Sequence, residues 1–341
     1  MKKVIRLISL ISALAIFIVL VVLGLFIANN MIKNYLYECP SILPSSLDQK
    51  VNYNNYSNQM NRIDVNDRYI AIHRTVLWKS CIVVWDKNRN PIDLVPADCG
   101  FRLDGNDLYY SKGISVYKLD LSTKVKEKLD VSTSKFFVND GNIVWQALLD
   151  SKSAIKSKDN INDTVTLVET SKRYWVCDDL VYYTQGAEDN LYVFSLSSQE
   201  EKLIGALKDS NFDALLFQGE CLLYEAMKDG TLNVINTGTH EQTEIKLSIA
   251  PFYWADKVIT NCSAEHIFLS FQSVAVDGSF VSNKEHVNNG LWYIDPETYE
   301  QRKISDLVFD SLFMTDDYLF GTIGNDLYAV DLETFEVQEA N

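Results

Sequence analysis

The chain has 341 residues, of which 47% are hydrophobic and 12% aromatic, so it can bury a large core and is not a disordered polymer. Its formal net charge of −15 at pH 7 disfavours nucleic acid and anionic lipid as partners and favours cationic partners or metal ions. A need for solubility explains the same charge equally well.

An uncharged apolar stretch runs from Leu7 to Ala28. As a helix it is long enough to cross the roughly 30 Å hydrocarbon core of a bilayer. Three cations (Lys2, Lys3 and Arg6) precede it and only Lys33 follows closely, which predicts a cytoplasmic N-terminus. We therefore predict a cytoplasmic tail at residues 1–6 and a transmembrane signal-anchor helix at residues 7–28. The protein would be a single-pass protein of the cell membrane, with the rest of the chain extracytoplasmic.

A cleaved signal peptide is the alternative for this stretch. It would need a shorter apolar region and small residues at positions −1 and −3 of the cut. A cut after Ala28 puts Phe26 at −3, which is a poor match. Cys39 is a poor site for lipid attachment, because Glu38 precedes it and it lies well past the apolar stretch.

Residues 29–61 are predicted to be a linker, since the segment is rich in Asn, Ser and Tyr and contains Pro40 and Pro44. Such a linker would hold the following domain a short way from the membrane. An alternative for Val51 to Tyr56 is an extra outer strand that helps to close that domain.

One strand-rich phrase then recurs seven times between Ile63 and Glu339. The clearest copy reads Leu108-Tyr109-Tyr110-Ser111, followed by Val116 to Leu121 and then by Leu129. The second strands of the seven phrases are anchored 35 to 52 residues apart, at Ile70, Leu108, Ile143, Leu180, Leu222, Ile267 and Leu319. A repeat of this length built from strands is typical of a β-propeller, and no segment after residue 33 has helical periodicity. We predict an all-β fold over residues 62–341, a β-propeller of seven four-stranded blades, preceded by the one helix.

The third strands of the seven phrases align well, and four of them end in a recurring turn. These strands are predicted at Ile82 to Asp86, Val116 to Leu121, Ala154 to Asp159, Leu191 to Leu196, Leu232 to Asn236, Leu291 to Asp295 and Leu327 to Leu332. Four are followed by an Asp or Asn and, three residues later, a Thr: Asp120 and Thr123, Asn236 and Thr239, Asp295 and Thr298, Asp331 and Thr334. An Asp or Asn side chain here can accept the backbone N–H two residues on and close the hairpin without glycine.

These phrases resemble known propeller repeats. Leu108-Tyr109-Tyr110-Ser111 and Val181-Tyr182-Tyr183-Thr184 look like the Tyr-Trp-Thr-Asp blades of lipoprotein-receptor propellers. The stretch Leu327 to Thr334 resembles bacterial repeats of the same kind, including those of a family of unknown function in Gram-positive bacteria. The resemblance implies a propeller, although receptor propellers have six blades and we count seven phrases. The Thr-Gly and Trp pairs of quinone-binding propellers are missing, so no cofactor is expected.

Cysteine spacing gives one candidate disulfide. The six cysteines show no metal-binding spacing. Cys81 and Cys99 flank a hairpin that turns at Lys87 to Pro91, so they could come close enough to form a disulfide. The predicted extracytoplasmic location would allow such a bond, and we predict this pair. The other cysteines fit buried thiols in strands.

No catalytic or metal-binding signature is found, so we predict no catalytic residue, no metal ligand and no enzymatic activity. The four histidines are scattered over different phrases. Paired acids such as Asp178-Asp179 and Asp316-Asp317 lie in the repeated turns, where turn formation accounts for them.

Aromatic and basic residues come together where the chain enters the inner strands, at the end opposite the Asp and Asn turns. They suit a peptide or a glycan bound at the mouth of the central channel. We predict a ligand face made of Arg102, Arg173, Trp175, Tyr253 and Trp254. The alternative is that these side chains pack between neighbouring blades.

The sequence thus predicts a membrane-anchored, extracytoplasmic, non-catalytic propeller that binds a protein or a cell-surface glycan, and no nucleic acid. Two alternatives stay open. A hydrolase or lyase acting on cell-surface glycan would need carboxylates that converge at the channel mouth. A structural assembly factor for another membrane protein would need no ligand at all.

Overall fold

The computed structural model describes the N-terminal helix and most of the chain after residue 62. The described residues are 17–30, 32, 37, 39–42, 63–76, 79–97, 100–133, 136–139, 141–149, 152–158, 164–168, 173–177, 179–186, 190–207, 215–218, 222–226, 231–236, 239, 241–247, 257–262, 266–272, 288–315, 317–324 and 326–340.

The described strands form seven four-stranded sheets, numbered here in chain order. Sheet 1 contains β1 (Ile63–Val65), β2 (Tyr69–Val76), β3 (Lys79–Asp86) and β4 (Pro91–Pro96), and sheet 2 contains β5 (Phe101–Asp104), β6 (Asp107–Lys112), β7 (Ser115–Asp120) and β8 (Lys126–Ser132). Sheet 3 contains β9 (Phe136–Asn139), β10 (Asn142–Leu149), β11 (Lys152–Lys158) and β12 (Val165–Val168), and sheet 4 contains β13 (Arg173–Cys177), β14 (Leu180–Gln185), β15 (Asn190–Ser195) and β16 (Glu201–Ala206).

The remaining three sheets follow the same pattern. Sheet 5 contains β17 (Leu215–Gln218), β18 (Leu222–Ala226), β19 (Thr231–Asn236) and β20 (Gln242–Lys246), and sheet 6 contains β21 (Lys257–Cys262), β22 (Ile267–Gln272), β23 (Gly290–Ile294) and β24 (Gln301–Ser305). Sheet 7 contains β25 (Ser311–Met314), β26 (Tyr318–Ile323), β27 (Asp326–Asp331) and β28 (Val337–Glu339).

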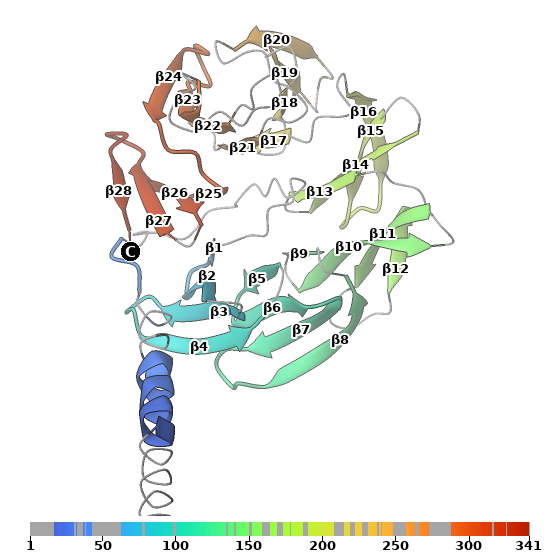
Figure 1. Cartoon of the computed structure of the whole chain (residues 1–341). Coiled ribbons are helices and arrows are strands. Elements are labelled where there is room, and N and C mark those ends of the chain that lie inside the picture. Colours follow the sequence, from blue (N-terminus) through green and yellow to red (C-terminus); the bar gives the residue numbers. More distant parts are fainter. Residues whose placement is uncertain are drawn as a thin grey trace, which may run out of the picture.

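Every sheet is an antiparallel meander whose strands pair in chain order. Figure 1 shows the sheets arranged around a centre, with the first strand of each innermost and the fourth at the rim. The anchor residue predicted for each second strand lies within one residue of the start of the observed second strand. Each predicted third strand overlaps the observed third strand of the same sheet. The prediction of an all-β β-propeller is confirmed.

The burial of the strands explains the sequence pattern. Second strands such as β6 and β22 are buried along almost their whole length, because both faces of each sheet are covered by neighbouring sheets. Fourth strands such as β8 and β20 are mostly exposed and carry alternating charges. The aromatic and β-branched residues of the repeats therefore lie between sheets, where they form the core.

Hydrophobic clusters join most neighbouring sheets. Phe101 packs with sheet 1 residues, Tyr109 with sheet 3 residues, and Phe137 with sheet 4 residues. The same holds for sheets 4 and 5, and for sheets 6 and 7. Residues of sheet 1 also pack with residues of sheet 7, so the first and last sheets are in contact.

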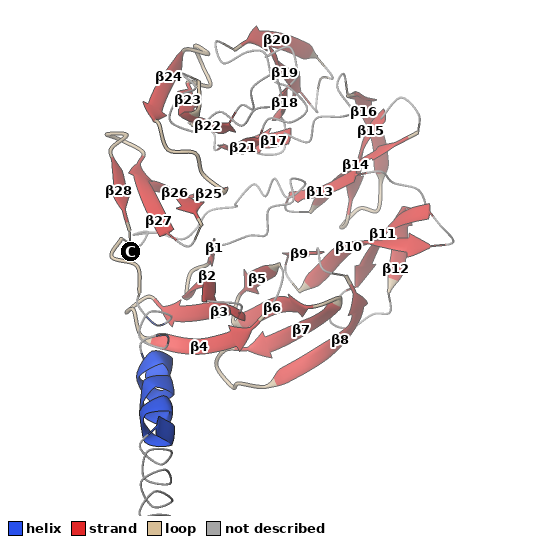
Figure 2. Ribbon diagram, in the orientation of Figure 1, coloured by secondary structure: helices blue, strands red, loops and turns tan. Residues whose placement is uncertain are grey.

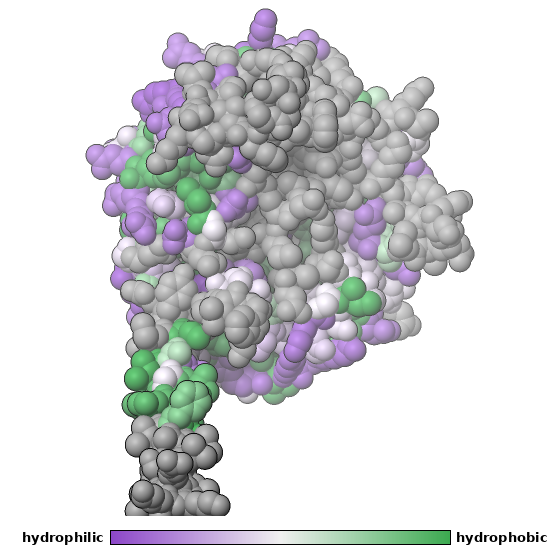
Figure 3. All heavy atoms as spheres, in the orientation of Figure 1, coloured by the Kyte–Doolittle hydropathy of each residue, from purple (hydrophilic) through white to green (hydrophobic). Residues whose placement is uncertain are grey.

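Residues 17–30 form a helix that projects from the sheets (Figures 1 and 2). Along this helix the large apolar side chains are exposed to solvent. In Figure 3 it stands out as a hydrophobic rod below the domain. Of the predicted span Leu7 to Ala28, residues 7–16 lie outside the described part of the chain. Within the described part, no helix has both the length and the apolar character needed to cross a membrane.

The close approach of Phe309 to Gly321 gives a test of this packing. Phe309 is fully buried before β25, and a Cβ at Gly321 in β26 would collide with its ring. We expect Gly321→Ala to destabilise the protein by about 1–3 kcal/mol, as overpacking does. The control Gly205→Ala, in the outer strand β16, meets only the flexible side chain of Gln242 and should change stability by less than about 0.5 kcal/mol. Urea unfolding of the full-length chain in detergent measures both, and equal stability of the two variants would contradict the packing.

Candidate functional site

The domain has two faces that differ in the chain segments they carry. The turn face holds the connections between the first and second strands and between the third and fourth strands of each sheet. The loop face, at the other end, holds the connections between second and third strands and those between successive sheets. Of the predicted ligand-face residues, Arg102 and Arg173 lie at the start of the inner strands β5 and β13, which is at the loop face.

Arg102 is the one member of the predicted ligand face whose side chain is described, and it is buried. Only 5% of it is exposed. Its Nη1 donates to the Phe101 carbonyl oxygen at 2.9 Å, and its guanidinium carbon lies 5.8 Å from the centre of the Phe137 ring in sheet 3. Arg102 therefore sits between sheets 2 and 3, where a cation–π contact accompanies its burial.

The other members cannot be placed in the same way. Arg173 and Trp175 belong to the inner strand β13, and the structure does not describe their side chains. Tyr253 and Trp254 lie outside the described residues. The five residues thus remain a predicted ligand face, with Arg102 set back from the surface.

The described aromatic side chains near the starts of the inner strands pack between sheets. Phe101, Phe136, Phe137, Tyr174 and Phe309 are all at most 6% exposed. The rings of Phe137 and Tyr174, from sheets 3 and 4, meet edge to face at a centroid distance of 5.4 Å. For these positions the alternative stated from the sequence, packing between neighbouring blades, is what the structure has.

Cys81 of the candidate disulfide is buried in β3 with a free thiol, which donates to the Arg74 carbonyl oxygen at 3.7 Å. Burial raises the pKa of this thiol, because desolvation disfavours the thiolate. Cys99 lies outside the described residues, so its pairing with Cys81 stays a prediction.

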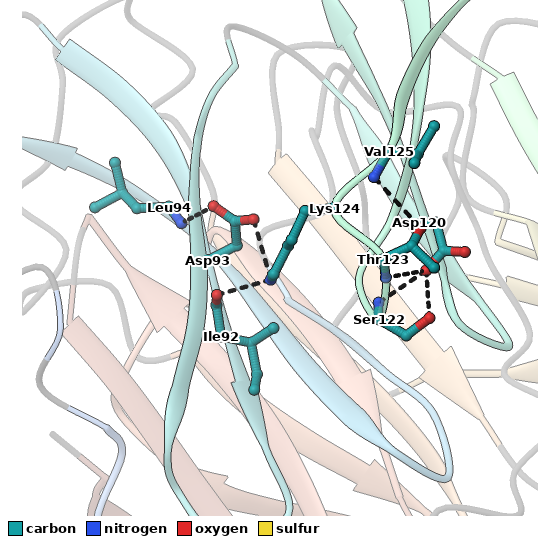
Figure 4. Close-up of polar contacts among 8 residues, drawn as sticks. All are labelled: Ile92, Asp93, Leu94, Asp120, Ser122, Thr123, Lys124 and Val125. Atoms are coloured by element: carbon teal, nitrogen blue, oxygen red, sulfur yellow. Dashed lines mark hydrogen bonds and ion pairs between the residues drawn. The ribbon is translucent and has the colours of Figure 1, made fainter.

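The turn face is built from a repeated polar turn at the ends of the third strands. The Asp120 carboxylate accepts the Ser122 and Thr123 backbone N–H groups at 2.8 and 2.9 Å and the Ser122 hydroxyl at 2.6 Å (Figure 4). Asn236, Asp295 and Asp331 accept backbone N–H groups in the same way. The Asp-x-x-Thr interpretation of the sequence is thus confirmed at atomic level.

In five of the hairpins between third and fourth strands, a residue other than glycine adopts a positive φ angle. The residues are Arg89 (φ 66°), Lys124 (63°), Gln199 (57°), Tyr299 (60°) and Phe335 (61°). For example, Lys124 N–H donates to the Asp120 carbonyl oxygen at 2.8 Å. The side chain at this position is free to reach the neighbouring sheet. Lys124 Nζ binds the Ile92 carbonyl oxygen at 2.9 Å and Asp93 at 3.2 Å in β4 of sheet 1 (Figure 4).

Hydrogen bonding sets the charge state of the turn carboxylates. Bonds from the Ser122 hydroxyl and then the Thr123 N–H lower the pKa of Asp120 to about 2. The Thr298 and Thr334 N–H groups likewise lower the pKa of Asp295 and Asp331. These carboxylates therefore stay ionised in acid and give the turn face a persistent negative charge.

An aromatic cluster on the turn side of sheets 6 and 7 was missed by sequence reasoning. Phe335, at the positive-φ position of its turn, lies 4.8 Å from Tyr293 and 6.2 Å from His266 between ring centroids. The exposed Arg302 places its guanidinium carbon 4.4 Å from the centre of the Phe335 ring. The signal was present, since the Asp-x-x-Thr turn is followed by Tyr299 in one copy and by Phe335 in another.

The described carboxylates near the inner strands have structural partners. Asp64 in β1 is 1% exposed and accepts the Leu103 N–H of β5 at 2.7 Å. Asp104 in β5 accepts the Gly141 N–H of sheet 3 at 2.6 Å, and Asp310 accepts the Gly324 N–H at 2.7 Å. Two of these bonds join neighbouring sheets. Among the described residues, no group of three or more His, Cys, Asp or Glu side chains is placed to hold a metal ion.

No family model and no curated protein matches the chain. Solved structures do match it in fold. The extracellular domain of the one-component system BT4673 from B. thetaiotaomicron has a TM-score of 0.54 at 13% identity, over 82% of this chain and 41% of that one. Acylaminoacyl peptidase from Pyrococcus horikoshii has a TM-score of 0.55 at 11% identity, over 83% of this chain and 52% of that one.

BamB from Moraxella catarrhalis is a looser match, with a TM-score of 0.48 at 10% identity over 78% of this chain and 82% of that one. The chain spans about half the length, or less, of the BT4673 extracellular domain and of the acylaminoacyl peptidase. At such low identity the likeness establishes the fold alone. Together, the sheets and the comparisons define the chain as a β-propeller protein.

The polar turn at Asp120 gives a prediction with a definite sign. A carboxyl group with a folded-state pKa of about 2 and an unfolded value of about 3.9 stabilises the fold above about pH 4. That contribution is lost as the pH falls through about 2. Asp120→Asn should therefore be less stable than the wild type at pH 7, with a difference that shrinks between pH 4 and pH 2. Urea midpoints measured across this range test it, with Asp130→Asn, an exposed carboxylate of β8, as the control. A difference that is constant with pH would contradict the assignment.

Proposed function

We propose that this protein is a membrane-anchored, extracytoplasmic propeller that binds a protein or a cell-surface glycan without catalysing a reaction on it. The observation that carries the proposal is the helix at residues 17–30. Its large apolar side chains are 43–66% exposed and lie on all sides of it, so water is an unfavourable surrounding for it. With the apolar residues before it, the stretch from Leu7 to Ala28 would reach about 33 Å as a helix.

The orientation follows from charge. Three cations stand before the apolar stretch and one closely after it, and the side with more Lys and Arg stays in the cytoplasm. The propeller then lies outside, which is also the setting in which a Cys81–Cys99 disulfide would persist. An acidic domain at this location suits neutral or cationic partners rather than nucleic acid.

We infer that the seven sheets are seven blades of one ring, and that the chain is a relative of the lipoprotein-receptor-like propellers it resembles in sequence. The packing of sheet 1 against sheet 7 supports a closed ring. The binding surface is proposed to be the loop face, where connections vary in length and where the sequence predicts that Arg173, Trp175, Tyr253 and Trp254 come together.

The hydrolase alternative finds no specific support among the described residues. It requires two or three carboxylates that converge near the channel mouth. The described candidates Asp64, Asp104 and Asp310 instead accept backbone N–H groups in the structure of the sheets. A non-catalytic role fits this pattern better, whether the partner is a ligand or another membrane protein that the propeller helps to assemble.

Membrane anchoring is tested by replacing two residues of the helix. We expect the wild type to stay with membranes after an alkaline wash, and Val19→Arg/Leu23→Arg to be recovered in the soluble fraction, since each charge opposes insertion by about 2.5–3.5 kcal/mol. Val19→Leu/Leu23→Ile is the matched apolar control and should stay with membranes. Recovery of the wild type in the soluble fraction would contradict the anchor.

The ligand face is tested separately. Full-length protein is cross-linked in its native membrane, and what stays attached is identified by mass spectrometry. Trp175→Ala and Trp254→Ala should each lower the captured partner or glycan several-fold, because aromatic anchors dominate such interfaces. Val125→Ala, at an exposed hairpin of the opposite turn face, is the control. Reduced stability with unchanged capture in both Trp variants would show that these rings only pack between blades.

A further inference from the structure

The contact between sheet 1 and sheet 7, called here the seam, differs from every other contact between neighbouring sheets. Each of these two sheets is made of four consecutive strands, so no strand is exchanged across the seam. The chain itself links each other pair of neighbours, because one sheet follows directly on the last. At the seam only non-covalent contacts hold the two sheets together.

The core of the seam is apolar. Sheet 1 contributes Ile63, Ile72 and Trp85, all at most 5% exposed, while sheet 7 contributes Phe320 and Leu327. Burial of such side chains stabilises the contact by roughly 25 cal/mol for each Å² removed from water. An opened seam would expose this whole cluster.

Tyr37 and residues 39–42, called here the clip, bind both sides of the seam through their backbone groups. The Trp85 indole N–H donates to the Tyr37 carbonyl oxygen at 3.3 Å. Arg89, in the turn after β3, donates from Nη2 to the Ser41 carbonyl oxygen at 2.9 Å. Ser41 N–H donates to the Ala340 carbonyl oxygen, just after β28, at 2.7 Å. Two bonds therefore hold sheet 1 and one holds sheet 7.

The clip also fills the seam with apolar side chains. Pro40 and Ile42 line a cavity of only about 10 Å³ together with residues of both sheets, namely Ile63, Val65, Ile70, Ile72, Phe320 and Leu327. Cys39 and Ile32 pack on the same cluster. Ile32 lies two residues beyond the helix at residues 17–30, so the cluster of the seam is contacted close to the end of that helix.

We propose that the clip is what closes the ring, so that the segment which carries the helix also controls whether the seam is open. Displacement of the helix relative to the ring then strains this seam before any other. Release of the clip exposes the apolar cluster between sheets 1 and 7. The sequence assigned residues 29–61 to a linker, and the clip is a part of that linker with a conformational role.

The cysteine in the clip supplies a probe of its state. Cys39 is half-buried, and its burial raises the pKa of its thiol, since desolvation disfavours the thiolate. Alkylation of Cys39 is therefore slow while the clip is docked and faster once it is released.

The test uses the full-length protein in detergent micelles. Ile42→Ala/Arg89→Ala removes apolar contact and one hydrogen bond from the clip, and Ile114→Ala, a 66% exposed isoleucine far from the seam, is the matched control. We expect hydrogen exchange about tenfold faster in β1, β2, β26 and β27 of the double variant, with β6 and β7 unchanged, and faster alkylation of Cys39. The control should match the wild type in both measurements.

Two results would overturn the proposal. One is exchange at the seam that equals the wild type's, and the other is a uniform rise over all seven sheets. If the double variant fails to fold, Ile42→Ala alone removes apolar contact from the clip and keeps the Arg89 charge, which favours the Cys39 thiolate. It should raise the alkylation rate of Cys39 about twofold, and alkylation of Cys39 in Ile42→Ala at the wild-type rate would then refute the clip.

Discussion

The burial of both faces of every sheet is the constraint on which this structure depends. A four-stranded sheet whose second strand is buried over nearly its whole length, as β22 is, is covered on both faces. Each sheet therefore needs two neighbours, and the first and last sheets can have two only if they meet. At the seam, sheets 1 and 7 pack together although they are not consecutive in the chain.

Polar groups complement this packing by joining the sheets at fixed points. Asp64 and Asp104 each accept a backbone N–H of the next sheet, and Asn66 Nδ2 donates to the Gly105 carbonyl oxygen across the same kind of boundary. Because these polar groups are used in hydrogen bonds between sheets, we assign the turn face a structural role. The loop face, with its connections of varying length, is left as the surface that is free to specialise.

The strands and turns were predictable from the sequence because their signals are local. Short aromatic-rich runs place β6 and β14, and Asp120 with Thr123 predicts the hairpin that follows β7. What Arg102 contacts was not predictable, since its partner Phe137 lies in another sheet and no spacing rule pairs the two. The docking of the clip was missed for the same reason, because its partners Trp85, Arg89 and Ala340 lie far along the chain.

These features combine into one account of the molecule. An exposed apolar helix precedes residues that pack at the seam of a propeller. The binding role proposed above would use the rigidity of such a scaffold, and the proposed clip would be a point at which the helix and the ring influence each other.

A map of the full-length protein in lipid nanodiscs by electron cryo-microscopy would test this account most directly. We predict seven four-stranded sheets around one axis, with sheets 1 and 7 in contact and the clip between them. Six sheets around the axis, or a seam without the clip, would contradict it.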